Sequence, residues 1–217
     1  MKSKIVQNKN RTILIPISLF LGLLFLILSY FVNKDVFRGI DYDLMVQSQN
    51  TFPRFVDLPF SILTLIGSSE VVLLGVLSIF SYYLLKKKRI FLSIFLFGAI
   101  FIIEIFGKLF IYHPIPPPLL NRNVLPFHLP SSFLVHTNYS YPSGHMSRIT
   151  FMLGILIFLF TIETSKKSPK ILFYFGVGVL IALMAISRVY LGEHWASDVV
   201  GGILLGGSIA GLSTAFW

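Results

Sequence analysis

The apolar stretch TILIPISLFLGLLFLILSYFVN, residues 12–33, decides the fold class of this chain. It carries no charged residue between Arg11 and Lys34, and a membrane-spanning helix needs about 20 predominantly apolar residues. A secretory signal peptide also follows a basic N-terminus, but its apolar region covers only about 7–15 residues and leads to a small-x-small cleavage site. The stretch is longer and no such site follows it, so we expect an uncleaved first transmembrane helix.

The rest of the chain repeats this apolar pattern. Of its 217 residues 55% are hydrophobic and 12% are charged, whereas about a quarter of a soluble domain is charged. Five further apolar runs cover residues 57–86, 90–112, 143–163, 171–190 and 195–217. The last run contains closely spaced glycines, which favour close helix packing: Gly201, Gly202, Gly206, Gly207 and Gly211. We therefore expect one all-α domain over residues 1–217, a polytopic membrane protein with six transmembrane helices.

The connection of residues 34–56 predicts a short amphipathic helix on the membrane surface. Its apolar residues recur every three to four positions, as on one face of a helix: Val36, Phe37, Ile40, Leu44 and Met45. We expect Asp41 and Asp43 to lie on the polar face of this helix rather than to take part in chemistry.

Basic residues predict the topology. They cluster in residues 2–11, 86–89 and 166–170, which alternate with pairs of predicted spans, and cytoplasmic segments carry an excess of Lys and Arg. We expect both termini in the cytoplasm and the protein in a bacterial inner membrane. The net charge of +9 follows from these clusters, so we expect no nucleic-acid partner. The absence of cysteine excludes disulfides, thiolate zinc sites and a cysteine nucleophile.

Three basic residues lie inside or at the edge of apolar runs: Lys108, Arg148 and Arg188. Charges within a bilayer cost about 2.5–3.5 kcal/mol each and usually mark function. The predicted topology places all three near the non-cytoplasmic face, with His145 and His194 at the same level. Single side chains of this kind can snorkel to the lipid headgroups, but a cluster from several helices favours an anion-binding site.

Two local sequences give this cluster a chemistry. Pro142-Ser143-Gly144-His145 opens a predicted helix, where Ser143 suits the N-cap and Gly144 lets an anion approach the first-turn N–H groups. Further on, His194 and Asp198 lie one helical turn apart. Asp198 can accept a hydrogen bond from one imidazole nitrogen, which leaves the other nitrogen of His194 as a nucleophile.

With these motifs the chain resembles the type-2 phosphatidic acid phosphatase superfamily, the integral-membrane relatives of vanadium haloperoxidases. The Pro-Ser-Gly-His motif is complete at residues 142–145, and Ser-Arg-x5-His-x3-Asp is complete at residues 187–198. The first motif, Lys with Arg-Pro seven residues on, retains Lys108 and Pro116 but has Ile115 in place of the arginine. His113, Arg122 and Arg148 are candidate replacements, and we favour Arg148 because it follows His145 by three residues on one helix face.

The resemblance implies a lipid phosphatase that works at the non-cytoplasmic face, periplasmic or exterior, without a metal or cofactor. It implies that His194 attacks phosphorus, Asp198 orients His194 and His145 protonates the leaving group. The predicted phosphate-binding groups are Lys108, Ser143, Gly144, Arg188 and Arg148. The expected substrate is a lipid phosphate or diphosphate in the bilayer, and no obligate protein partner is inferred.

Two alternatives stay open. One is a phosphotransferase. In this reaction the attack of His194 on phosphorus gives a phosphohistidine, and an acceptor other than water then takes the phosphate from it. The other is a catalytically weakened lipid-phosphate binding or transport protein, which the missing arginine at position 115 supports.

Overall fold

The computed structural model describes residues 2–86, 91–127, 129, 137–164 and 166–217, and within these residues the chain is helical. The α-helices are α1 (Lys2–Asn33), α2 (Arg38–Thr51), α3 (Asp57–Thr64), α4 (Ser69–Leu85), α5 (Phe91–Phe110), α7 (Gly144–Glu163), α8 (Lys167–Tyr190) and α9 (Ala196–Ala215). Short 3-10 turns cover Arg54–Val56, Leu65–Gly67 and Pro118–Leu120. The described residues form no β-strand beyond one isolated bridge between Pro114 and Tyr139, which confirms the all-α prediction.

Five of these helices are long and apolar enough to cross a membrane: Arg11–Asn33 of α1, α5, α7, α8 and α9. A sixth span results if the bent pair Arg54–Gly67 and Ser69–Leu85 counts as one. The predicted second span, residues 57–86, falls on this pair, whose two helices are bent by 43° relative to each other. The bend occurs because Ser68 is extended and its hydroxyl accepts a hydrogen bond from the Val71 N–H at 3.3 Å, which starts a new helix.

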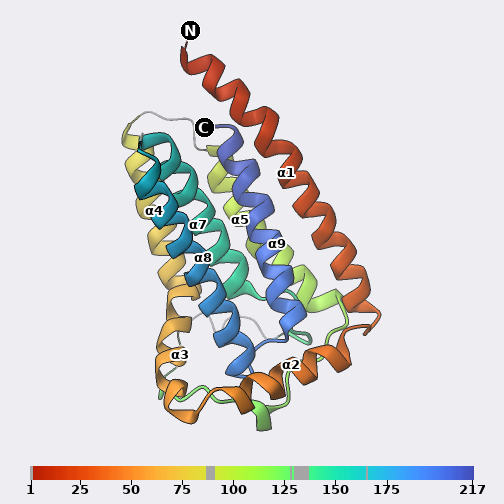
Figure 1. Ribbon diagram of the computed structural model, residues 1–217. Helices are drawn as coiled ribbons and strands as arrows, with labels where there is room; N and C mark the ends of the chain where they lie inside the picture. Colours follow the sequence, from red (N-terminus) through yellow and green to blue (C-terminus); the bar gives the residue numbers. More distant parts are fainter. Residues whose placement is uncertain (1, 87–90, 128, 130–136, 165) are drawn as a thin grey trace.

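Helix α9 lies at the centre of the bundle, against α1 and α7 (Figure 1). Its glycines permit this approach: a Cβ on Gly202 would lie 2.6 Å from the Ser143 carbonyl oxygen of α7's N-terminus, and one on Gly211 would overlap the Ser18 hydroxyl of α1. The expectation of close packing along the glycine-rich run is confirmed.

Both chain termini lie at one end of the bundle, and α2 lies across the other end (Figure 1). Termini at the same end are what an even number of spans requires. The cytoplasmic location of that end stays a prediction, and Lys87, Lys88 and Arg89 of the second basic cluster lie outside the described residues.

The predicted surface helix exists as α2, but the expected location of Asp41 is wrong. Asp41, Met45 and Gln49 form the buried face, and Asp41 is only 2% exposed. The bundle offers polar partners to this face: the Gln49 amide donates to the Tyr190 carbonyl at 2.8 Å. Ile40 and Leu44 point outward, which suits contact with lipid.

Candidate active site

The candidate site lies at the end of the bundle where α2 crosses it. The end of α5, the start of α7, the end of α8 and the start of α9 meet there (Figure 1). These four helix ends carry Lys108, Ser143, Gly144, His145, Arg188 and Asp198, with His194 just before α9. The structure thus brings together all the residues that the motifs single out, while their chemical roles stay predictions.

His194 and Asp198 form a hydrogen-bonded pair. The His194 Nδ1 lies 3.1 Å from Asp198 Oδ2, and the same oxygen accepts the Trp195 N–H at 3.0 Å. Asp198 therefore both caps α9 and fixes the His194 ring, since an imidazole whose Nδ1 donates to a carboxylate keeps Nε2 unprotonated. Burial lowers the pKa of His194, and the nearby cations Arg188 and Lys108 lower it further against the opposing effect of Asp198. The ring is thus held neutral, as a nucleophile requires.

A tight turn after α8 places His194 in this position. Gly192 has φ of +68° in the left-handed region, and a Cβ there would also overlap the Leu120 carbonyl. A residue with a side chain would strain this turn. The glycine lets the chain reverse between Arg188 and His194, so that both side chains enter one site.

The N-terminus of α7 presents unused donors. Ser143 occupies the N-cap position, as predicted, but its side chain makes no capping hydrogen bond. Among the described residues, the buried side-chain atoms without a hydrogen-bond partner include Ser143 Oγ, Arg148 Nε and Arg188 Nε. Buried polar atoms without partners are uncommon in folded proteins. Three of them at one site indicate a place for an acceptor-rich ligand.

The site cations are paired with carboxylates of the same chain. Lys108 Nζ lies 2.8 Å from Oε1 of Glu104, which precedes it by one turn of α5. Arg148 also pairs with Glu104, and Arg188 pairs with Glu193. The Glu104 carboxylate reaches the α7 N-terminus, because a Cβ on Gly144 would overlap it. This carboxylate lies beside the backbone that was predicted to meet phosphate.

The three candidates for the missing motif arginine all have polar partners within the protein. His113 contacts Asp198 and Asp41. Arg122 donates to the Gln49 carbonyl at 3.0 Å and to the Tyr190 hydroxyl at 3.1 Å. Arg148, the favoured candidate, stays close to the site but is bound to Glu104. His113 and Arg122 are therefore not directed toward the anion site.

A cavity of about 560 Å³ opens onto the site. His145, Arg188 and Glu193 line it from one side, and Thr64 and Ser68 line it from the bend between α3 and α4. Ile115 also faces this cavity. The bend that the sequence did not predict thus forms part of the wall.

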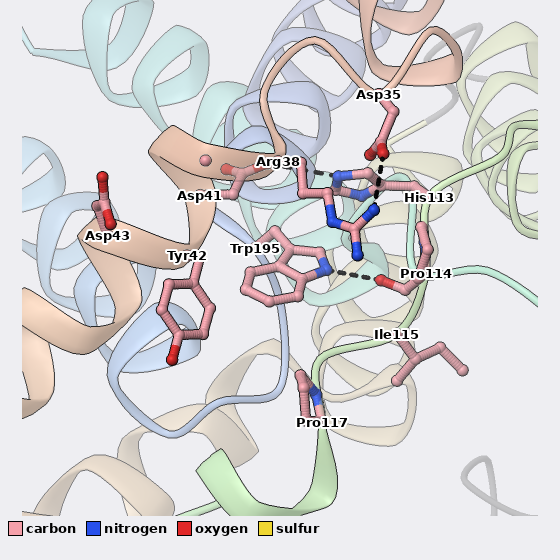
Figure 2. Close-up of a pocket in the computed structure, with 11 residues that line it drawn as sticks. Asp35, Arg38, Asp41, Tyr42, Asp43, His113, Pro114, Ile115, Pro117 and Trp195 are labelled. Carbon is pink, nitrogen blue, oxygen red and sulfur yellow. Dashed lines mark hydrogen bonds and ion pairs between the residues drawn. The ribbon is translucent and has the colours of Figure 1, made fainter.

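A second cavity of about 550 Å³ lies beside α2. Tyr42 and Trp195 face Ile115 and Pro117 across it, and Trp195 Nε1 donates to the Pro114 carbonyl at 2.6 Å (Figure 2). His113 lines this cavity and also contacts Asp198.

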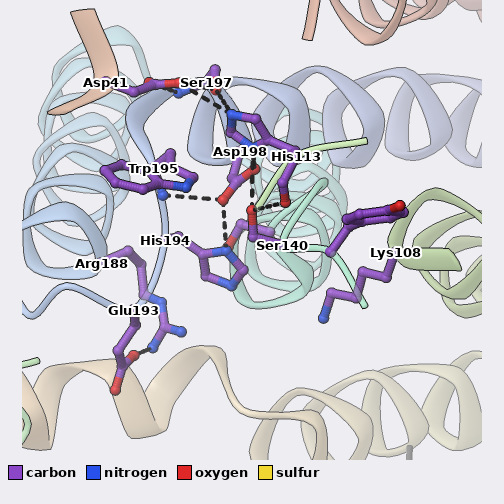
Figure 3. A network of polar contacts seen from close by, with 12 residues as sticks. Asp41, Lys108, His113, Ser140, Arg188, Glu193, His194, Trp195, Ser197 and Asp198 are labelled. Carbon is purple, nitrogen blue, oxygen red and sulfur yellow. Dashed lines mark hydrogen bonds and ion pairs between the residues drawn. The ribbon is translucent and has the colours of Figure 1, made fainter. Parts of the chain in front are cut away.

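Asp41 is the polar residue that the sequence reasoning missed. Its Oδ1 accepts the Ser197 N–H at 2.9 Å and its Oδ2 accepts the Ser197 hydroxyl at 2.6 Å. The same carboxylate faces His113 (Figure 3). Helix α2 is therefore joined to the start of α9 by a buried polar network.

Comparisons with known proteins identify the family of this chain. The PAP2 superfamily model matches residues 110–217, the part that carries both complete motifs. The chain is 42% identical over 77 residues to an undecaprenyl-diphosphatase of Sulfolobus acidocaldarius, and 37% identical over 75 residues to phosphatidylglycerophosphatase B of Bacillus subtilis. These segments are 36% and 34% of this chain, and they span only 33% and 37% of the two curated relatives.

The fold as a whole matches a solved structure. The crystal structure of a transmembrane PAP2 type phosphatidylglycerolphosphate phosphatase from Bacillus subtilis aligns with a TM-score of 0.72 and 23% identity, over 92% of this chain and 94% of that one. Apolar helices and a shared transmembrane fold make this chain an integral membrane protein. With two complete motifs, the family match and the common fold, the chain belongs to the PAP2 superfamily.

Proposed function

We propose that this protein is a membrane lipid phosphatase that hydrolyses a phosphomonoester or diphosphate headgroup through a phosphohistidine. One observation carries the proposal: Asp198 fixes His194 with Nε2 free, beside three buried donors that have no partner among the described residues. A nucleophile with an orienting carboxylate serves a covalent reaction, whereas simple binding does not need it. The relatives named above are phosphatases of lipid phosphates and diphosphates, which supports this substrate class.

The proposed reaction has two steps. In the first, His194 Nε2 forms a bond to phosphorus, the bond from phosphorus to the leaving oxygen breaks, and His145 gives that oxygen its proton. In the second, water adds to phosphorus, the N–P bond breaks, and the water proton passes to His145. The Ser143 hydroxyl, the Gly144 N–H, Lys108, Arg148 and Arg188 would hold the phosphoryl oxygens, since phosphoryl transfer depends mainly on positioning and charge neutralisation.

We propose that the reaction needs no metal. The site carboxylates in the described part of the chain are engaged: Glu104 with Lys108 and Arg148, Glu193 with Arg188, and Asp198 with His194. Mg²⁺ favours carboxylate oxygens that remain available. We also propose a site at the non-cytoplasmic face of a bacterial inner membrane, on the basis of the basic clusters in the sequence.

The test is phosphate release by the purified protein in detergent, with a panel that contains a lipid phosphomonoester and a polyprenyl diphosphate. We expect release in the presence of a chelator, and none from His194→Ala. Release by His194→Ala at the wild-type rate would refute the phosphohistidine mechanism. Transfer of phosphate to an added alcohol, without free phosphate, would favour the phosphotransferase, and binding without turnover would favour the binding protein.

A further inference from the structure

His113 lies immediately behind the proposed catalytic pair. It follows α5, and only 3% of the residue is exposed. Its Nδ1 lies 2.8 Å from Asp198 Oδ1, and its Nε2 lies 3.4 Å from Asp41 Oδ2 (Figure 3). A neutral imidazole donates from one nitrogen only, whereas the protonated ring donates from both. A carboxylate at each nitrogen therefore selects the cationic form.

The surroundings of His113 hold this cation in place. Besides Asp41 of α2 and Asp198 of α9, the Ser140 hydroxyl lies 3.1 Å from Nδ1 and the Ser197 hydroxyl lies 3.5 Å from Nε2. The rings of Tyr141 and Trp195 meet the imidazole edge-on, with centroids 6.4 Å away in both cases. The adjoining cavity is also lined by the charged or titratable residues Asp35, Arg38, Tyr42 and Asp43, and His194 lies beyond Asp198.

Asp198 divides its two oxygens between two histidines. Oδ1 faces His113, and Oδ2 takes the His194 Nδ1 together with the Trp195 N–H. The carboxylate cannot rotate without breaking a contact on each side. Because Asp198 is fully buried, loss of the His113 cation would remove the hydrogen bond to Oδ1 and free the carboxylate to move.

We propose that His113 is a positioning residue: its positive charge, held between Asp41 and Asp198, fixes Asp198 and through it the ring of His194. This inference rests on the proposed function, in which His194 is the nucleophile. His113 does not touch the substrate in this scheme, and it does not replace the missing motif arginine. Asp41 extends the arrangement to α2, so the helix across the end of the bundle supports the nucleophile.

The charge state of His113 gives the proposal a pH signature. Burial alone would lower the pKa of His113, but the hydrogen bonds and charges of Asp198 and Asp41 outweigh burial and raise this pKa to about 9. The folded-state pKa is above the ordinary value of about 6.5. The stabilising contribution is therefore complete below that value and is lost as the pH rises through about 9. We expect kcat to fall over the same alkaline range.

The kinetic test compares His113→Gln with the wild type. We expect kcat to fall about 10- to 100-fold, the range known for outer partners that orient metal-binding residues, with KM nearly unchanged and the alkaline fall of kcat absent. Asp41→Asn removes one of the groups that raise the pKa of His113, so its alkaline fall should move to lower pH. Asp43→Asn, the same change at an exposed position of α2, should keep the wild-type profile.

A second measurement does not depend on activity. Among the five histidines of the chain, nitrogen NMR of the labelled protein should show one that titrates near pH 9. That signal should be missing in His113→Gln and shifted to lower pH in Asp41→Asn. Titration of every histidine below about pH 7.5, close to the ordinary value, would overturn the proposal.

The two proposals fail differently. If His194→Ala still releases phosphate, the proposed function fails, whatever His113 does. If His194→Ala is inactive while His113→Gln keeps the wild-type kcat and its alkaline fall, only the positioning role of His113 is refuted.

Discussion

The contact between α9 and the start of α7 should set the geometry of the site, and Gly202→Ala tests it. An added Cβ would lie 2.6 Å from the Ser143 carbonyl oxygen and 2.7 Å from Met146 Cβ, whereas ordinary contact begins at 3.4 Å. The two backbones must therefore separate by about 0.8 Å, and overpacking of this kind costs about 1–3 kcal/mol. The Ser143 N–H also donates to the Asp198 carbonyl at 3.0 Å, so the shift stretches a bond between the two motifs.

The expected loss of activity follows from this displacement. A misplacement of about 1 Å can reduce turnover about 100-fold, so we expect Gly202→Ala to lose about 10- to 100-fold in kcat. Its thermal unfolding midpoint in detergent should also fall, although alanine favours a helix over glycine by about 1 kcal/mol.

Gly98→Ala is the matched control for Gly202→Ala. A Cβ on Gly98 of α5 would meet no heavy atom within 4 Å, so this variant gains helix propensity without a clash. It should be as active as the wild type and at least as stable. A Gly202→Ala protein with the turnover and unfolding midpoint of Gly98→Ala would refute the packing argument.

Three further substitutions test the charges and donors of the site. Glu104→Gln leaves the half-buried Lys108 and the buried Arg148 without their carboxylate, which should cost about 3–5 kcal/mol in the free energy of unfolding; an unchanged unfolding midpoint contradicts this. Ile115 is 54% exposed and lines the site cavity, so Ile115→Arg should lower KM about tenfold through one charge-assisted hydrogen bond, whereas the uncharged Ile115→Gln should not. Ser143→Ala removes a buried hydroxyl without a partner among the described residues, so it should keep or raise the unfolding midpoint while turnover falls; unchanged turnover would exclude the hydroxyl from phosphate binding.

The spans were predictable from sequence because length and continuous apolarity are local properties. The bend at Ser68 was not, since residues 57–86 form an almost unbroken apolar run. What breaks the helix is a capping hydrogen bond from the Val71 N–H to a serine, and serine alone is too common in such runs to indicate a break.

The motif residues were also predictable, because their spacing places them on helix ends that must meet. Asp41 was assigned wrongly for a physical reason. Its partner Ser197 lies 156 residues away, and helical periodicity reports only which residues share a face. The periodicity of α2 cannot indicate whether that face contacts lipid, water or polar groups of the bundle. His113 likewise lies in a proline-rich segment whose position only the tertiary fold determines.

The balance of charges explains why recognition at this site depends on directed donors. Lys108, Arg148 and Arg188 are offset by Glu104 and Glu193, and the His113 cation is shared by Asp41 and Asp198. Burying so many unpaired charges would cost several kcal/mol each, so a stable apoprotein requires these partners. The pairs leave almost no net charge to attract a phosphate. They do hold the cations rigidly, and a fixed donor stabilises a transition state without having to reorganise. Within the described part of the chain, the Ser143 hydroxyl and the Nε atoms of Arg148 and Arg188 have no hydrogen-bond partner. These groups gain most when a phosphoryl group enters, which places the specificity of the site in geometry rather than in excess positive charge.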